Sequence, residues 1–207
     1  MTNPAAVDAP AHDFTSTSLR TERLALRPWS EADIDALAAA CQDPETQRYV
    51  PLPSPYTRAD AETFIRQTAP NGRAAGTDIV FGVFETATGR PVAAVGLHRI
   101  KDLGAAYGGV AEIGYFTAPE ARGRGFMTEA ARALCRWGFE ELGLARIEWV
   151  AIAGNEPSWR VVEKLGFTRE GTLRASLVQH GERKDGWVGS LLRAEAALSL
   201  QGDPRDG

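Results

Sequence analysis

The sequence predicts a single α+β domain built on one mixed, mostly antiparallel sheet of about seven strands flanked by helices. Three observations support this fold class. Short segments of alternating residues meet across glycine-containing turns, which is typical of antiparallel hairpins. One long segment, Phe126–Leu142, carries apolar residues at helical spacing. No internal repeat or linker divides the chain, so one domain accounts for its 207 residues.

The first third of the sequence predicts one strand and two helices. Residues Arg20–Arg27 alternate and indicate a strand that a proline ends. Helices are expected at about Ser30–Cys41 and Thr57–Thr68, because each begins with a Ser or Thr N-cap. The proline-rich segment Pro44–Pro55 predicts an irregular connection, and Asn71-Gly72 predicts a loop.

The remaining sequence predicts two hairpins with a strand–helix–strand–helix unit between them. Turns at Gly89 and Gly181 join the strands of the hairpins. Gly143 and Gly166 end the two helices. The predicted strands are Ile79–Glu85, Pro91–Ile100, Glu112–Thr117, Arg146–Ala153, Phe167–Val178 and Arg183–Leu192, and the helices are Phe126–Leu142 and Pro157–Leu165.

Composition argues against several classes of protein. A net charge of −4 and a pI near 5.5 argue against non-specific binding to nucleic acid. No apolar run approaches the length of a membrane-spanning helix. The two cysteines, Cys41 and Cys135, lack metal-type spacing and are expected to be small apolar fillers. We therefore predict no metal site, no membrane partner and a cytoplasmic, reducing location.

Both ends of the chain differ from the central domain, which we place at residues 19–196. Residues 1–18 are rich in Ala, Pro, Ser, Thr and Asp, and they lack the basic start and apolar centre of a signal peptide. They predict a flexible N-terminal tail. Residues 197–207 predict a similar C-terminal tail.

The turn that follows the strand Glu112–Thr117 is the most informative feature of the sequence. Gly123 and Gly125 let the backbone direct its N–H groups toward a bound group and allow that group a close approach. The helix after them adds unpaired N–H groups and the positive end of its dipole. Arg122 and Arg124 add positive charge. The turn therefore predicts an anion site, with a diphosphate as the favoured ligand.

Two familiar phosphate-binding motifs fit this turn poorly. A P-loop requires Lys followed by Ser or Thr, whereas Phe126, Met127 and Thr128 follow the glycines here. A dinucleotide-binding fold requires three glycines directly after a strand and an acid at the end of the next one. Thr128 occupies the third glycine position, and Glu148 lies near the middle of the next predicted strand.

A third interpretation fits two separate blocks of the sequence. Arg122-Gly-Arg-Gly125 resembles the acyl-coenzyme A loop of the GNAT N-acyltransferase superfamily, although Met127 stands where a small residue is usual. Asn155-Glu-Pro-Ser-Trp-Arg-Val-Val-Glu-Lys-Leu-Gly-Phe167 is similar to the second signature of that family. There an Asn opens a short helix and Leu-Gly-Phe closes it into the next strand. Within the superfamily, Leu19–Pro28 and Asp43-Pro-Glu resemble the RimJ/RimL-type branch of protein N-terminal acetyltransferases.

This resemblance implies a GNAT-like sheet that is splayed between its fourth and fifth strands, with acetyl-CoA as the co-substrate in the gap. The backbone of the strand Glu112–Thr117 would pair with the pantetheine amides, the glycine turn would hold the diphosphate, and the Asn of the second block would contact the pantetheine. The implied cofactor-binding residues are Tyr115, Phe116, Thr117, Arg122, Gly123, Arg124, Gly125, Phe126, Met127, Thr128 and Asn155.

Acyl transfer requires a neutral amine, so the candidate catalytic residues are those that move protons. Strand alternation places Glu112 near the expected thioester, which makes it the candidate base; an ion pair would be its structural role. His98 is an alternative base, although a hydrogen-bonded structural histidine is the favoured interpretation. Family members often use a tyrosine acid where this chain has Val162, so Ser158 is the candidate acid.

The resemblance thus implies an N-acetyltransferase that moves an acetyl group from acetyl-CoA to a primary amine by direct attack in a ternary complex. The amine is a protein N-terminus or a small molecule. A non-catalytic acyl-CoA-binding sensor or interaction module is the alternative. No nucleic-acid partner is expected, and the sequence allows a homodimer.

Overall fold

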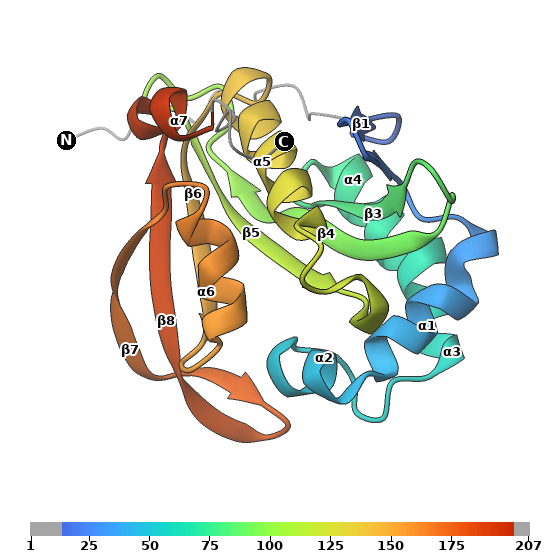
Figure 1. Ribbon diagram of the computed structural model, residues 1–207. Helices are drawn as coiled ribbons and strands as arrows, with labels where there is room; N and C mark the ends of the chain where they lie inside the picture. The colour runs from blue at the N-terminus through green and yellow to red at the C-terminus, as the bar shows by residue number, and fades with distance from the viewer. Residues whose placement is uncertain (1–13, 201–207) are drawn as a thin grey trace.

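The computed structural model describes residues 14–200 and contains one sheet of eight strands flanked by helices (Figure 1). The strand order is β1-β2-β3-β4-β5-β6-β8-β7, and every neighbouring pair is antiparallel except β5 and β6. This arrangement confirms the predicted mixed α+β fold. The strands are β1 (Leu19–Arg20), β2 (Leu24–Arg27), β3 (Ile79–Glu85), β4 (Pro91–Lys101), β5 (Gly109–Thr117), β6 (Leu144–Ile152), β7 (Thr168–Gln179) and β8 (Glu182–Leu192).

The helices surround this sheet on both faces, and several adjoin one another. The α-helices are α1 (Ile34–Gln42), α2 (Pro44–Tyr49), α3 (Arg58–Thr63), α4 (Ala69–Ala75), α5 (Phe126–Glu140), α6 (Glu156–Glu163) and α7 (Arg193–Ser199), with short 3₁₀ turns at Glu31–Asp33 and Pro119–Ala121 and a π turn at Phe64–Thr68.

The predicted strand Arg20–Arg27 is wrong as one element, because it folds into two short antiparallel strands. Thr21 closes the turn between β1 and β2: its N–H donates to the Leu24 carbonyl at 2.9 Å, and its hydroxyl accepts from the Leu24 N–H at 3.0 Å. Threonine side chains that bond to the local backbone favour such turns over a continuous strand. The extra strand raises the count from about seven to eight.

Two other sequence predictions are wrong in the helical region. The segment Pro44–Pro55 was expected to be irregular, but α2 occupies its first six residues. Asp43 caps that helix by accepting from the Thr46 N–H at 2.8 Å, and Pro44 takes the first helical position. The expected loop Asn71-Gly72 lies inside α4, since the helix continues to Gly76, which has a left-handed φ of 71°.

The parallel strands β5 and β6 position the candidate site. They pair only over Gly109–Ile113 and Leu144–Trp149. Beyond that point, residues 114–117 of β5 and 150–152 of β6 do not pair with each other, and the strands diverge (Figure 1). The expected splay between the fourth and fifth predicted strands is therefore present, between β5 and β6 of the structure.

Two hydrophobic clusters hold the layers together. The larger lies between the sheet and α5 and includes Phe81, Leu134 and Trp149. The smaller lies among α1, α3 and the opposite face of the sheet, and Phe116 of β5 packs against it. Strand alternation explains this division, because Ile113 faces the α5 side whereas Phe116 faces the other.

The predicted tails only partly overlap the described residues. Residues 1–13 and 201–207 lie outside them. Phe14, which belongs to the predicted N-terminal tail, is buried, and its carbonyl accepts a hydrogen bond from Arg73 at 2.8 Å. The helix α7 extends to Ser199 and so passes the predicted domain boundary. Within residues 14–200, no helix combines the length and the apolar character needed to cross a membrane.

Candidate functional site

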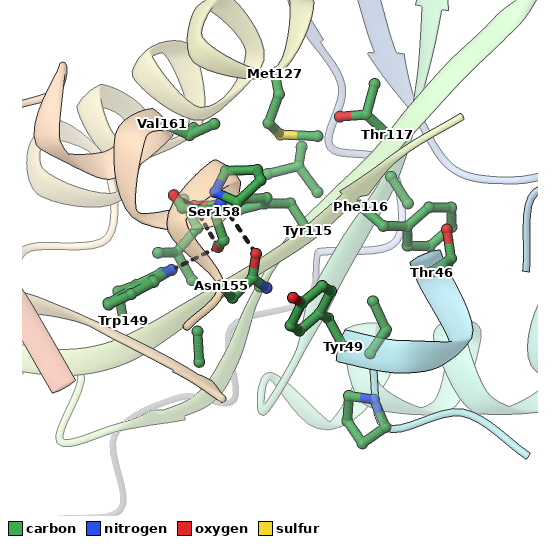
Figure 2. A pocket seen from close by; sticks show the side chains of 18 of the residues that line it. Thr46, Tyr49, Tyr115, Phe116, Thr117, Met127, Trp149, Asn155, Ser158 and Val161 are labelled. Atoms are coloured by element: carbon green, nitrogen blue, oxygen red, sulfur yellow. Dashed lines mark hydrogen bonds between the residues drawn. The ribbon is translucent and has the colours of Figure 1, made fainter. Parts of the chain in front are cut away.

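A cavity of about 920 Å³ lies where β5 and β6 diverge. The glycine turn and the start of α5 form one end of its wall, and α6 forms another side. Figure 2 shows Thr46 and Tyr49 of α2 on one side of the cavity, with Trp149, Asn155 and Ser158 on the other. Gln179 near the tip of the β7–β8 hairpin also lines it. Residues from most of the length of the chain therefore line this one cavity.

The glycine turn has the geometry of an anion-binding loop. Gly123 and Gly125 have φ values of 75° and 77°, which side chains rarely tolerate. Gly125 is the N-cap of the fifteen-residue helix α5, and no side chain caps that helix. A Cβ added at Gly123 would meet no atom within 4 Å. The free N–H groups and the open space fit the diphosphate of coenzyme A.

The arginines of the turn are engaged in ion pairs with neighbouring elements. Arg122 pairs with Asp43, and it also donates to the Thr117 carbonyl at 3.3 Å. Arg124 pairs with Glu85. Arg23 was not among the predicted residues, yet its guanidinium donates to the Arg124 carbonyl at 3.3 Å and lies near Gly125. The ion pairs fix the turn against α2 and β3, and the backbone N–H groups remain the main anion donors.

The free edge of β5 is the second cofactor-binding feature. Tyr115, Phe116 and Thr117 pair on one side with Val95, Ala94 and Ala93 of β4. On their other side they have no strand partner in residues 14–200, because β6 has already diverged. Such an edge can accept an extended amide chain as an additional strand.

The start of α6 meets β5 and β6 through a compact hydrogen-bond network (Figure 2). Ser158 Oγ accepts from Trp149 Nε1 at 3.0 Å and donates to the Tyr115 hydroxyl at 3.1 Å. The Tyr115 hydroxyl in turn donates to the Ser158 carbonyl at 2.8 Å. Asn155 caps the helix by accepting from the Ser158 N–H at 3.2 Å. Burial raises the pKa of Tyr115, so its phenol stays protonated.

Val162, which stands where many superfamily members have a tyrosine, is fully buried. It faces the core under α6 and presents no polar atom to the cavity. Met127, at the position where a small residue is usual, is also buried in the core cluster at the start of α5. Ser158 and Tyr115 therefore supply the hydroxyl groups at this end of the cavity.

Glu112 lies in the cavity wall on β5, directly opposite His98 of β4. Its side chain is 17% exposed and pairs with Arg99. Arg99 reaches it from a β-bulge between His98 and Lys101, where its φ of 51° is unusual for a residue with a side chain. The bulge thus places a cation beside the candidate base, a feature that strand alternation does not reveal.

His98 also lines the cavity, and its Nδ1 lies 3.1 Å from Asp78 Oδ1. This hydrogen bond is the largest cause of the lowered pKa of Asp78. Asp78 was not predicted, because it precedes β3 and carries no local motif. The sequence signal for Asp78 was His98, which lies twenty residues later. The antiparallel pairing of β3 and β4 brings the two residues side by side.

The side of the cavity formed by α2 and the β7–β8 hairpin contains residues that are not among the predicted site residues. Thr46 and Tyr49 come from α2, and Leu177 and Gln179 come from the β7–β8 hairpin. An Asp-Pro start at Asp43 is a helix-capping signal that could have revealed α2. Within residues 14–200, no group of three or more His, Cys, Asp or Glu side chains is arranged to hold a metal ion.

Comparisons with known proteins agree with this geometry. Residues 23–168 match the family model described as an acetyltransferase (GNAT) domain. The uncharacterised N-acetyltransferase YoaA of Bacillus subtilis (strain 168) is 33% identical over 175 residues, which cover 84% of this chain and 96% of YoaA.

Two solved structures share the fold. A GNAT-family acetyltransferase from Bacillus anthracis has a TM-score of 0.72 and 27% identity, with 86% of this chain and all of that chain covered. RimJ of Mycobacterium smegmatis, solved with a CoA-disulfide, has a TM-score of 0.75 and 22% identity, with 86% and 85% covered.

The splayed sheet, the uncapped glycine turn and the family match lead to one conclusion. The chain belongs to the GNAT acetyltransferase family and is an acetyl-CoA-dependent N-acetyltransferase.

Proposed function

We propose that the acceptor is a primary amine that enters the cavity between α2 and the β7–β8 hairpin, opposite the start of α6. One observation carries this proposal: the glycine turn, the free β5 edge and the carboxylate of Glu112 all line the same cavity. Acetyl-CoA supplies the activated acetyl group. The turn and strand edge hold it by its diphosphate and amides, so the thioester lies toward Glu112 and Ser158.

The residues proposed to hold the co-substrate come from β5, the start of α6 and the glycine turn. The backbone of Tyr115, Phe116 and Thr117 pairs with the pantetheine amides, and Asn155 contacts the same arm. The turn binds the diphosphate through residues Arg122, Gly123, Arg124, Gly125, Phe126, Met127 and Thr128.

The protonation state of the amine favours an α-amino group over a lysine. An α-amine has a pKa of roughly 8 and a lysine amine roughly 10.4, so about a tenth of α-amines but under about a thousandth of lysines are neutral at pH 7. The difference is about 3 kcal/mol. A protein N-terminus or a small amine with a similar pKa therefore demands less of the base.

Glu112 and Ser158 are the proposed proton carriers. Glu112 receives the proton of the amine through a water molecule, and its ion pair with Arg99 holds the carboxylate in the cavity wall. Ser158 donates its hydroxyl proton toward the departing thiolate in place of the Tyr115 oxygen that accepts it in the structure, and solvent returns a proton to Ser158. A thiolate is a good leaving group, so proton donation by Ser158 accelerates the reaction less than proton removal by Glu112.

We also propose a cytoplasmic location, where reducing conditions keep both buried cysteines free. A homodimer is the assembly to be tested, by light scattering of the purified chain. The charge of −4 supports the absence of a nucleic-acid partner.

The proposed function is tested by thiol release from acetyl-CoA across a panel of N-terminal peptides, polyamines and small primary amines. Amine-dependent release, with mass spectrometry of the acetylated product, is the expected result. Tight coenzyme A binding in calorimetry without release for any amine would overturn it and indicate a non-catalytic sensor.

A further inference from the structure

Asp78 and His98 form a dyad beside Glu112. Asp78 precedes β3, His98 lies in β4, and the two strands pair antiparallel. Their side chains meet through the 3.1 Å contact between Asp78 Oδ1 and His98 Nδ1. Both residues line the cavity, with side chains that are 38% and 37% exposed. The dyad is therefore open to whatever occupies the acceptor side.

Two glycines hold the imidazole ring against the sheet. A Cβ built on Gly96 would lie 3.2 Å from His98 Nε2, and one built on Gly114 would lie 3.2 Å from both Nε2 and Cδ2. The missing side chains make room for the ring across β4 and β5. Asp78 fixes one nitrogen, while Nε2 makes no hydrogen bond within residues 14–200.

The register places this ring next to the candidate base. His98 and Glu112 are direct partners across the antiparallel pair β4–β5, so their side chains lie on the same face. The charged groups around the ring are Asp78 ahead of β3, Arg99 on its own strand and Glu112 on β5. One cation and two carboxylates thus surround the imidazole.

We propose that His98, positioned by Asp78, is the final acceptor of the proton that leaves the amine, and that Glu112 passes this proton to it. The inference rests on the proposed acetyl transfer to a primary amine. Glu112 lies opposite His98 across β4 and β5, so it can pass a proton to the ring. Asp78 occupies Nδ1, which leaves Nε2, against Gly114 of β5, as the nitrogen that accepts the proton.

The reaction balances with these roles. An ammonium acceptor gives up one proton through Glu112 to His98 Nε2, and the freed lone pair attacks the thioester carbonyl carbon. A carbon–nitrogen bond forms, the carbon–sulfur bond breaks, and sulfur keeps the electron pair. The amide nitrogen loses a second proton, the thiolate gains one, and His98 later releases its proton to water. The products are the N-acetylated amine, coenzyme A and one proton.

Activity measurements on variants test the relay. His98→Gln is expected to lower kcat/KM by about 10²-fold, and Asp78→Asn by about tenfold, with coenzyme A affinity and Tm close to wild type. Because both residues serve one relay, Glu112→Gln/His98→Gln should lose no more than the worse single variant. Losses that multiply, or full activity in His98→Gln, would overturn the proposal.

Chemical rescue separates a proton carrier from a structural histidine. Imidazole in the buffer should raise the activity of folded His98→Ala at least about tenfold and leave Glu112→Ala unchanged. Absence of rescue in a His98→Ala protein that melts like wild type would overturn the relay.

A second readout does not depend on turnover. Nitrogen-15 NMR of the histidine rings should show the His98 proton on Nδ1 in the wild type and a changed tautomer in Asp78→Asn. A proton on Nε2 of the wild type would overturn the assignment. Failure of the wild type to release thiol with any amine would instead reject the proposed function, and the NMR result would still decide the geometry of the dyad.

Discussion

Glu112 and Glu148 show how position separates two similar carboxylates. They are register partners on β5 and β6, and each pairs with an arginine, Arg99 and Arg146. Glu112 lines the cavity, and Glu148 does not belong to its wall. Two glutamates that each pair with an arginine therefore differ in location: Glu112 lies in the cavity wall and Glu148 lies outside it.

Glu112→Gln is expected to lower kcat by about 10²–10⁴-fold because it removes the group that first receives the proton of the amine. The affinity for coenzyme A should change little, since the diphosphate lies at the glycine turn. Steady-state kinetics and calorimetry measure both quantities. Glu148→Gln is the matched control and should keep wild-type turnover. Equal kcat values for the two variants would remove Glu112 from the mechanism.

The two cysteines are expected to be inert. Burial raises the pKa of Cys41 and of Cys135 to about 12, so both remain thiols at neutral pH. Since only the thiolate reacts, a disulfide reagent should label neither in the folded protein at pH 7–8, and both after unfolding. Labelling should begin only as the pH approaches about 12. Fast labelling of native protein at pH 8, or loss of turnover in Cys135→Ala with an unchanged Tm, would contradict this.

At the residue scale, the sequence indicated the roles of some residues but not their partners. Strand alternation places Glu112 on the same face of its strand as Gly114 and Phe116, and all three line the cavity. Arg99 reaches Glu112 from a bulge with a left-handed φ, and no period-two pattern encodes such a bulge. Asp78 pairs with His98 only because β3 and β4 align in one register. Long-range pairing of this kind requires the assembled sheet.

At the scale of elements, we propose that the turn before α5 binds the diphosphate of the co-substrate. Gly125→Val is expected to weaken coenzyme A binding at least tenfold. A branched side chain at a φ of 77° costs about 1–2 kcal/mol, and it also reorients the N–H groups of the first helical turn. Calorimetric titration with coenzyme A measures the change.

Gly89 provides the matched control for that variant. Its φ is 69°, an added Cβ would meet no atom within 4 Å, and it lies in the turn between β3 and β4 outside the cavity wall. Gly89→Val should show similar backbone strain in its Tm but bind coenzyme A normally. Equal loss of affinity in both variants would assign the effect to stability and reject the loop assignment.

Arg73 of α4 connects the first described residues of the chain to β3. Arg73 is buried and donates to the carbonyls of Phe14, Thr17 and Val80. Arg73→Met should lower the stability by about 2–4 kcal/mol, because it removes the buried guanidinium that donates to three carbonyls. Denaturant unfolding measures the loss. An unchanged midpoint would show that water replaces these bonds without cost.

The helices illustrate which elements the sequence could predict. α5 and α6 have regular apolar spacing and a glycine just beyond each end, Asn155 caps α6, and their predicted positions are confirmed within a few residues. α2 has six residues and several prolines around it, so composition favoured a loop. Asp43 stabilises the helix instead, because it accepts from the Thr46 N–H and forms an ion pair with Arg122. Tertiary contacts therefore override composition for short elements.

At the scale of the whole molecule, the cavity forms where β5 and β6 diverge, and α2 and the β7–β8 hairpin complete its wall. The sequence predicted the splayed sheet and its co-substrate half, because those segments carry local motifs. The acceptor half is assembled from α2 and the β7–β8 hairpin, which lie far apart in the chain. Gln179 joins them: its amide donates to the carbonyls of Gln47 at 2.8 Å and Val50 at 2.9 Å.

Gln179→Ala is expected to raise KM for the amine about 3- to 30-fold and to leave coenzyme A affinity unchanged. Two hydrogen bonds of about 1 kcal/mol each hold the hairpin against α2, and their loss lets the acceptor side open. Glu182→Gln is the control, because Glu182 lies on the same hairpin and pairs with Lys184 of its own strand. Acceptor titrations at saturating acetyl-CoA measure KM for each variant. A Gln179→Ala enzyme with wild-type KM for its amine would show that the hairpin does not shape the acceptor side.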